Sequence, residues 1–175
     1  MNCLITAVKE EYIHHFGNKN FAVLRAIICY YRVLNFRVAV LICTMQKTDS
    51  LRKKQRLKKK LKLKYSVDIG LDSKVGIHPW VEHYTGLVIG NGVVIGDYCT
   101  LYQGVTIGQR HNKYPIIGDR VVVYPNAVIL GGVTVGDDSI VLAGSVVIDD
   151  VPEKCIVGGN PAIVKKKIVD SDEIY

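Results

Sequence analysis

The fold is decided by residues 117–147, which read IGDRVVVYPNAVILGGVTVGDDSIVLAGSVV. An aliphatic residue recurs there at every sixth position, and the same spacing continues towards both ends of the chain. Two extra residues interrupt it at Leu87-Val88, and four interrupt it between Gly108 and Ile116. Thirteen positions keep one register: Ile69, Val75, Val81, Ile89, Ile95, Leu101, Ile107, Ile117, Val123, Ile129, Val135, Val141 and Val147. Such a strict short period indicates a structural repeat.

A six-residue aliphatic period does not fit one straight strand, in which side chains alternate between two faces. The chain must turn between consecutive aliphatic positions, so that these side chains lie inside and the corners lie outside. Three units then complete one triangular turn, and stacked turns bury a core that no single unit buries. Glycine is frequent at the second position, where we expect it to relieve backbone strain, and the fifth position is small or β-branched. A β-sandwich, the alternative, predicts variable spacing.

The positive charge of the chain is confined to one segment. The net charge is +7, but residues 52–64, RKKQRLKKKLKLK, hold nine of the 23 Lys and Arg and no acid. The remainder holds 14 basic and 16 acidic residues, so we expect no nucleic-acid partner. A solvated helix face is the first interpretation of this run. Peripheral contact with an anionic membrane surface or a lipid-linked glycan is the second.

Composition also bears on the compartment. The five cysteines are scattered and form no CxxC motif, which favours a reducing environment. The N-terminus shows no secretory signal, and Arg25, Arg32 and Arg37 interrupt the apolar residues 21–45, so we expect no spanning helix. These features predict a cytoplasmic protein, with the inner face of the membrane as the alternative location for the basic run.

The first 66 residues are predicted to be helical, because proline is absent before Val67 and glycine is absent between Gly17 and Gly70. Residues 20–46 predict one long helix or a helix pair with its inward positions at Phe21, Leu24, Ile28, Tyr31, Leu34, Val38, Leu41 and Cys43. Three organisational parts follow: a helical segment 1–66, a β-helix 67–164 and a C-terminal tail 165–175.

A further helix is predicted to carry the basic run. Thr48, Asp49 or Ser50 is expected to cap its N-terminus. Its apolar stripe is expected at three positions: Leu51, Leu57 and Leu61.

The six-residue period, its two interruptions and the closing Gly158-Gly159-Asn160-Pro161-Ala162 resemble one known family. The chain is similar, over about residues 67–167, to the left-handed parallel β-helix acyltransferases, specifically the serine acetyltransferase branch and the related sugar and capsule O-acetyltransferases. The resemblance implies a mainly β fold, a left-handed parallel β-helix with a short α-helical N-terminal segment. It also implies an acetyl-CoA-dependent O-acetyltransferase that forms a homotrimer with active sites between subunits.

The first interruption carries the predicted catalytic base. His83 lies fifteen residues after Asp68, the separation at which serine acetyltransferases carry their catalytic base and its orienting acid. Imidazole suits the chemistry, because it accepts a hydroxyl proton near neutral pH while a carboxylate stabilises the imidazolium. The resemblance therefore predicts direct attack of the acceptor on acetyl-CoA, assisted by His83 and Asp68. Without the resemblance, we would interpret His83 as an ordinary surface histidine.

The acceptor site departs from the serine enzymes, where an Arg-His-Pro sequence holds the amino acid. Alignment on Pro115 places Lys113 and Tyr114 at the Arg and His positions, and His111 is the alternative replacement for that histidine. Glu82 stands where the serine enzymes carry Asp before the base. Together with the short helical segment, these departures favour a sugar hydroxyl in polysaccharide or capsule biosynthesis over L-serine.

The acetyl-CoA site is also implied by the resemblance. Its slot lies between adjacent turns of neighbouring subunits, and the cofactor phosphates need cations. The residues expected to line the slot or meet the phosphates are Gly108, Gln109, Ala143, Gly159, Lys165 and Lys166. A solvated C-terminal tail is the alternative interpretation of the lysines.

Two rival functions come from other classes. His78, His83 and His111 suggest a zinc site of the γ-class carbonic anhydrase type, but the lone histidine follows the spaced pair here, whereas those enzymes carry it first. We therefore expect no metal. A non-catalytic scaffold is the second rival, since a fold does not guarantee an activity.

Overall fold

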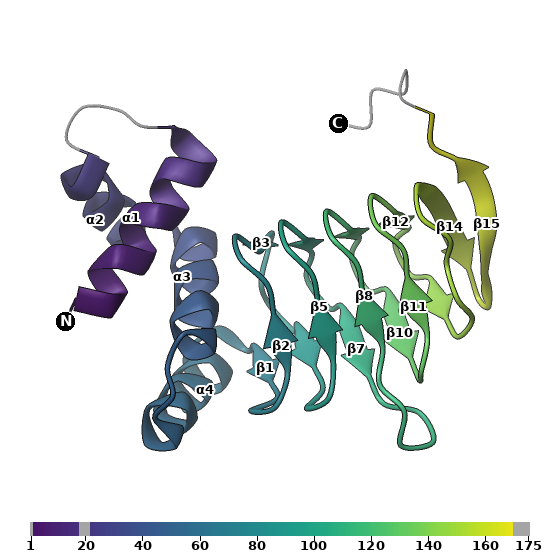
Figure 1. Ribbon diagram of the computed structural model, residues 1–175, viewed down its shortest axis with the longest axis horizontal. Coiled ribbons are helices and arrows are strands. Elements are labelled where there is room, and N and C mark those ends of the chain that lie inside the picture. The colour runs from purple at the N-terminus through teal and green to yellow at the C-terminus, as the bar shows by residue number, and fades with distance from the viewer. Residues whose placement is uncertain (1, 18–21, 170–175) are drawn as a thin grey trace.

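The computed structural model describes residues 2–17 and 22–169, and within these ranges four helices precede a parallel β-helix (Figure 1). The helices are α1 (Asn2–Phe16), α2 (Ala22–Arg32), α3 (Leu34–Gln46) and α4 (Leu51–Tyr65). The predicted fold class, a mainly β parallel β-helix behind a helical segment, is confirmed. Phe21 and residues 170–175, which belong to two of the predictions above, lie outside the described residues.

The strands form three sheets, which are the three sides of the β-helix. The five-stranded sheet holds β1 (Asp68–Ile69), β4 (Val88–Ile89), β7 (Thr106–Gly108), β10 (Val128–Leu130) and β13 (Val146–Val147). The four-stranded sheet holds β2 (Lys74–Val75), β5 (Val94–Ile95), β8 (Ile116–Ile117) and β11 (Thr134–Val135). The six-stranded sheet holds β3 (Trp80–Val81), β6 (Thr100–Leu101), β9 (Val122–Val123), β12 (Ile140–Val141), β14 (Cys155–Gly159) and β15 (Ala162–Lys167). From β1 to β13 each strand enters the next sheet in turn.

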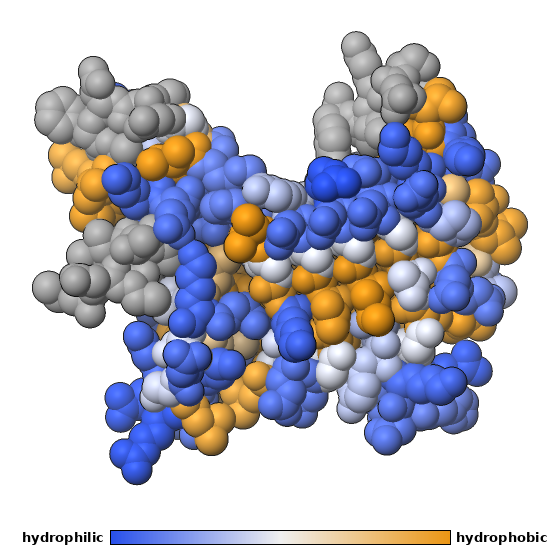
Figure 2. Space-filling view, in the orientation of Figure 1, coloured by the Kyte–Doolittle hydropathy of each residue, from blue (hydrophilic) through white to orange (hydrophobic). Residues whose placement is uncertain are grey.

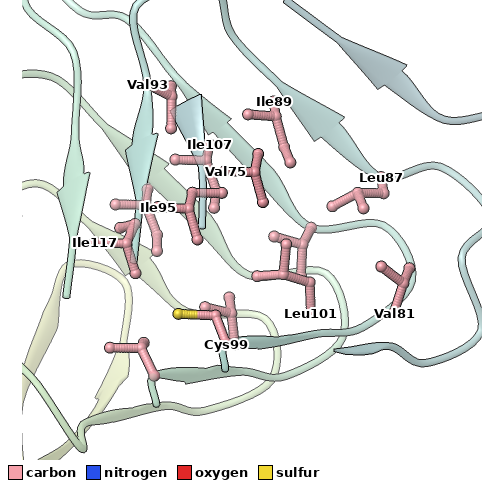
Figure 3. Close-up of a cluster of buried hydrophobic side chains, with 14 of the residues drawn as sticks. Val75, Val81, Leu87, Ile89, Val93, Ile95, Cys99, Leu101, Ile107 and Ile117 are labelled. Carbon is pink, nitrogen blue, oxygen red and sulfur yellow. The ribbon is translucent and has the colours of Figure 1, made fainter. Parts of the chain in front are cut away.

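The interior confirms the six-residue register. All thirteen predicted inward positions are at most 7% exposed, and Figure 3 shows several of them, such as Ile95 and Leu101, pointing into one core. Neighbouring turns pair these positions directly, as Ile89 pairs with Ile107. The small or β-branched fifth positions are buried as well: Ser73, Val93, Cys99, Val105, Val121, Ala127, Val133, Ser139, Ser145 and Val151. Each turn therefore contributes two inward side chains per side.

The expected reason for the second-position glycines is wrong. Gly96 and Gly118 do not have positive φ, whereas the corner residues Tyr98 and Arg120 do. Glycine is needed at these positions because the next turn approaches closely: a Cβ on Gly96 would lie 2.3 Å from Asp119 Oδ1. That oxygen accepts a hydrogen bond from the Asp97 backbone N–H at 2.8 Å, so it is not free to move away.

The replacement Gly96→Ala is expected to destabilise the β-helix, by about 1–3 kcal/mol for an overpacked site. Gly108→Ala is the matched control, because Gly108 occupies the same repeat position and a Cβ there would meet only Leu130 Cδ2 at 3.7 Å. Denaturant unfolding followed by circular dichroism measures both variants. Equal stability of the two would show that close approach does not select glycine at these corners.

Helix α3 closes the first turn of the β-helix. Its Val38, Leu41, Ile42 and Met45 belong to the same buried cluster as the inward side chains of the strands. Helix α4 adds Leu61 to this cluster, with Leu57 partly buried beside it. The helical segment and the β-helix therefore share one hydrophobic core, and the open end of the three sheets is covered.

The predicted inward face of α2 is wrong. Leu24, Ile28 and Tyr31 are 57%, 44% and 71% exposed, whereas Ala26 is buried in the cluster formed with α1 and α3. The helix breaks at Val33, and α2 therefore packs with its opposite side against its neighbours. Helical spacing defines an apolar face, but it does not say which elements meet that face.

Three smaller expectations about the helices have mixed outcomes. The predicted inward position Leu34 is 44% exposed, and Leu51 is 59% exposed because it stands at the first turn of α4, outside the core. Ser50 is the residue at the α4 N-cap, as expected, but its side chain forms no capping hydrogen bond.

Within the described ranges no single helix is long and apolar enough to cross a membrane. Two consecutive helical segments are long and apolar enough only when they are taken together: Val23–Arg32 and Leu34–Gln46. They are bent by 108° relative to each other.

A buried carboxylate joins α1 to the β-helix. Glu11 is 3% exposed; its Oε1 accepts a hydrogen bond from the Cys43 thiol at 3.1 Å and lies 3.1 Å from His78 Nδ1. Its Oε2 lies 3.4 Å from His15 Nε2. Burial raises the pKa of Glu11, but the hydrogen bonds of His15 and Cys43 and the charge of His78 outweigh it, and the pKa falls below its usual value. His14 stacks on His78, with ring centroids 4.3 Å apart.

The docking of α1 is expected to weaken in acid. Burial, followed by the charges of His15 and His78, lowers the pKa of His14, so the unfolded chain takes up this proton at a higher pH than the folded chain. Stability therefore decreases as pH falls below about 6.5, the unfolded value, and Glu11 adds a further loss below about 4.5. Thermal unfolding between pH 7 and pH 5 measures the effect, which should be smaller in His14→Gln.

The control for this experiment is His111→Gln, which alters an exposed histidine of a corner loop. It should retain the pH dependence of the unmodified chain. A His14→Gln variant whose melting temperature follows pH as steeply as the unmodified chain would contradict the expectation.

Candidate active site

The first interruption forms a corner between the six-stranded and five-stranded sheets. Leu87 is buried and Val88 begins β4, so the two extra residues lie within residues 82–86 and not at Leu87-Val88 as expected. The Gly86 N–H donates to the Ser66 carbonyl, which holds the corner on the end of α4. The Tyr84 ring packs edge-on against Tyr65 with centroids 5.7 Å apart. His83 adopts a φ of 50° and its side chain is 68% exposed. The insertion therefore presents an imidazole outwards without disturbing the core.

Glu82 is the carboxylate beside this imidazole. Its Oε2 accepts a hydrogen bond from Trp80 Nε1 at 2.7 Å, and its Oε1 lies 3.7 Å from His83 Nε2. The Glu82 side chain is 27% exposed, so it is partly withdrawn from water beside a well exposed histidine. Trp80 was not among the predicted site residues. Its signal in the sequence is its place two residues before Glu82, which puts both side chains on one side of an extended segment.

Asp68, the predicted partner of His83, is held by α4. Lys62 Nζ donates to Asp68 Oδ2 at 2.5 Å, and Lys58 Nζ lies 3.5 Å from Oδ1. The hydrogen bond from Lys62, aided by the charge of Lys58 and opposed by burial, lowers the pKa of Asp68. Within the described ranges no hydrogen bond or ion pair links Asp68 to His83. Two lysines of the basic run thus face the β-helix and are not simply solvated.

The second interruption forms a loop at another corner. Residues 109–115 connect β7 in the five-stranded sheet to β8 in the four-stranded sheet. Gln109 Oε1 accepts a hydrogen bond from the Asn112 N–H at 2.9 Å, and Arg110 pairs with Lys113 through backbone bonds. His111 is exposed, whereas Tyr114 is partly buried over Gly92, whose added Cβ would lie 2.6 Å from the Tyr114 ring. In a single chain this loop and His83 occupy different edges of the β-helix.

The residues predicted to bind the cofactor are spread along the β-helix. Ala143 lies between β12 and β13, at the same edge as His83 and three strands further along the six-stranded sheet, about 14 Å at the usual strand spacing. Gly108 ends β7 beside the loop, and Gly159 ends β14 with a φ of 109°. Gly159, Lys165 and Lys166 therefore belong to the six-stranded sheet from which His83 emerges, and Ala143 lies at the edge of that sheet.

Lys165 and Lys166 belong to β15, which pairs antiparallel with β14, so the strand continues across the predicted boundary between residues 164 and 165. Both side chains are exposed. Directly after β15, Ile168 packs on Val122 and Ile140 of the six-stranded sheet. This part of the chain is therefore attached to the β-helix as far as Ile168.

The three histidines of the zinc alternative occupy three different corners. His78 lies between the four-stranded and six-stranded sheets, His83 between the six-stranded and five-stranded sheets, and His111 between the five-stranded and four-stranded sheets. His78 is engaged with Glu11. Across residues 2–17 and 22–169 no group of three or more His, Cys, Asp or Glu side chains is arranged to hold a metal ion.

Comparison with known proteins shows which proteins this chain is similar to. Residues 114–149 match the family described as bacterial transferase hexapeptide (six repeats). The serine acetyltransferase of Synechococcus elongatus is 40% identical over 102 residues, which are 51% of this chain and 42% of the relative. That of Mycobacterium tuberculosis is 37% identical over 94 residues, 51% of this chain and 41% of the relative. The predicted resemblance to the serine acetyltransferase branch of the hexapeptide-repeat transferases is thereby confirmed.

Solved structures agree with the hexapeptide-repeat fold. Soybean serine acetyltransferase superposes with a TM-score of 0.75 at 25% identity, covering 94% of this chain and 69% of that chain. The enzyme from Vibrio cholerae superposes with a TM-score of 0.77 at 24% identity, covering 95% and 67%. The β-helix is thus the left-handed hexapeptide-repeat type. The chain spans about two fifths of the length of the two curated relatives named above.

Replacement of Lys62 by methionine is expected to raise the pKa of Asp68, because it removes the largest interaction that favours the carboxylate. Carboxyl carbon resonances followed by NMR during an acid titration measure this pKa. Lys60→Met is the matched control: Lys60 is an exposed lysine of the same helix, and it should leave the Asp68 titration unchanged. An unchanged pKa in Lys62→Met would show that the helix does not hold this carboxylate in solution.

Proposed function

We propose that this protein is an acetyl-CoA-dependent O-acetyltransferase in which His83 is the general base and L-serine is the acceptor. The observation that carries the proposal is the exposed imidazole at the first interruption, beside a carboxylate, on a β-helix similar to serine acetyltransferases. A scaffold without activity has no need of that arrangement, and the proposal therefore rests on the site and not on the fold.

The reaction moves an acetyl group from a thioester to a hydroxyl. The acceptor oxygen attacks the thioester carbonyl carbon while His83 takes the hydroxyl proton. The C–S bond of the tetrahedral intermediate then breaks, and the His83 imidazolium returns the proton to the coenzyme A sulfur, which leaves as a thiol. The oxyanion of the intermediate needs N–H donors, which glycine-containing corners offer. Asp68 is the proposed orienting acid, and its two carboxylate oxygens contact Lys62 and Lys58.

The cofactor site follows the edge that carries His83. A Brucella abortus serine acetyltransferase of this fold, 23% identical, has been solved with coenzyme A. For this chain we place the pantetheine arm past Ala143 and Gly159, with Lys165 and Lys166 towards the phosphates. Gly108 and Gln109 lie at a different edge of the same chain, so in this arrangement they come from a neighbouring subunit.

The same geometry supports a homotrimer. His83 and the loop 109–115 occupy different edges of one chain, so a site that uses both needs two subunits. Figure 2 shows a hydrophobic band over β5 and β8, where Ile116 is 51% exposed. A neighbouring β-helix packed on this side would cover the band and bring the two interruptions together.

The acceptor is proposed from the relatives. The curated proteins that match are serine acetyltransferases, and structures of the soybean and Neisseria gonorrhoeae enzymes, both 25% identical, hold serine. The sequence-based preference for a sugar has no support from them. A sugar hydroxyl stays the second candidate because of Lys113 and Tyr114, and Tyr114 is packed over Gly92.

In His83→Ala, acetyl transfer from acetyl-CoA to L-serine is expected to fall by about 10²–10⁴-fold, the usual contribution of a general base. Release of coenzyme A measures the rate, and added imidazole should restore part of it. Size-exclusion chromatography and circular dichroism check that the variant keeps its assembly and fold.

A panel of acceptors completes this experiment. L-Serine, free sugars and nucleotide sugars are compared with acetyl-CoA as the donor. Turnover of a sugar in preference to L-serine would overturn the serine assignment. Full activity in His83→Ala, or no acetyl transfer by the unmodified protein to any acceptor, would overturn the enzyme assignment.

A further inference from the structure

Trp80 is the single tryptophan of the chain, and it lies between the helical segment and the candidate base. We propose that Trp80 is a positioning residue: its indole N–H holds the Glu82 carboxylate beside His83, and helix α1 holds the indole through His15. The inference rests on the proposed acetyl transfer and adds to it a link between the helical segment and the acceptor site.

The first step is the bond between Trp80 and Glu82. Trp80 Nε1 donates to Glu82 Oε2 at 2.7 Å, a short distance for an indole donor and typical of a bond to an ionised acceptor. Because the Glu82 side chain is only 27% exposed, its carboxylate has lost part of its water and depends on this donor. The bond fixes the torsions of a flexible side chain, so that the second oxygen points in one direction.

The second step is the direction of that oxygen. Glu82 Oε1 lies 3.7 Å from His83 Nε2, which is too long for a hydrogen bond. Both atoms therefore stay available to a bound acceptor. A hydroxyl that donates to the imidazole and a neighbouring donor group that reaches the carboxylate fit this pair together. Trp80 thus acts on the acceptor through Glu82 and touches no reacting atom itself.

The third step is the support of the indole from α1. The His15 ring contacts the Trp80 ring, with centroids 4.5 Å apart and a tilt of 56°. His15 Nε2 in turn lies 3.4 Å from the buried Glu11 carboxylate, which also binds His78. The backbone of Trp80 is held by its sheet, since its N–H donates to the Cys99 carbonyl. Helix α1 therefore contacts the indole ring, and strand β6 pairs with the main chain of Trp80.

The test is a double-mutant cycle on acetyl transfer. Trp80→Phe keeps an aromatic ring for His15 but removes the N–H, and is expected to raise KM for the acceptor about tenfold or more, while KM for acetyl-CoA is unchanged. In a Glu82→Ala background the same change should have little further effect, because the bond is already gone. A structural role alone would lower stability and give additive losses. Such additivity overturns the proposal.

A matched control and a second variant make the result specific. Thr100→Val alters the residue paired with Trp80 on the next strand, and both KM values should be unchanged. His15→Ala should reproduce part of the rise in acceptor KM, since it removes the support of the ring. An unchanged acceptor KM in His15→Ala would overturn the link to α1.

Fluorescence separates this inference from the proposed function. Emission comes from a single indole, so removal of the Glu82 carboxylate or the His15 ring should shift it, while Thr100→Val should not. If the unmodified protein transfers no acetyl group, the proposed function fails even though these shifts occur. If transfer occurs but neither Glu82→Ala nor His15→Ala shifts the emission, the positioning role of Trp80 fails alone.

Discussion

The structure depends on the stacking of inward side chains, turn over turn, in one register. Ile89 pairs with Ile107, and Ile107 pairs with Ile129, so each aliphatic side chain rests on its equivalent in the turns before and after it. A residue added within a strand would move every later side chain out of the core, because the sides alternate along a strand. Residues can be added only at corners, and both interruptions lie there. The chemistry of the protein is therefore confined to the edges of the β-helix.

Stacking also creates two ends: a helix covers the first, and an antiparallel strand is added at the last. At the first turn the helix α3 contributes Val38, Leu41, Ile42 and Met45 to the common core. At the last turn β15 pairs antiparallel with β14, and Ile168 packs against the outer side of the six-stranded sheet. Open strand ends and exposed aliphatic layers invite association with other chains, which these elements oppose. The helical segment thus belongs to the β-helix as a cover of its core.

The same cover reaches the candidate site. Helix α4 engages Asp68 through Lys62 and Lys58, and α1 engages the Trp80 ring through His15. These contacts place Asp68, which precedes the first interruption, and Glu82, which lies in it, under the influence of the helices. A charged segment that composition describes as solvated therefore has a local electrostatic role.

The sequence by itself determined the repeat, the inward positions and the two corners at which chemistry is concentrated, because the period of the aliphatic residues reflects a local constraint repeated along the chain. It also singled out His83 and Glu82, since both lie in the first interruption. Only the tertiary structure decided that the close approach of the next turn selects the glycines and that α2 turns Leu24 outwards. It alone decided that Asp68 meets Lys62. It also placed Trp80 between His15 and Glu82. Several of these depend on segments far apart in sequence, such as residues 15 and 80, whose meeting is set by how α1 and α3 pack on the first turn. No local period encodes such a meeting.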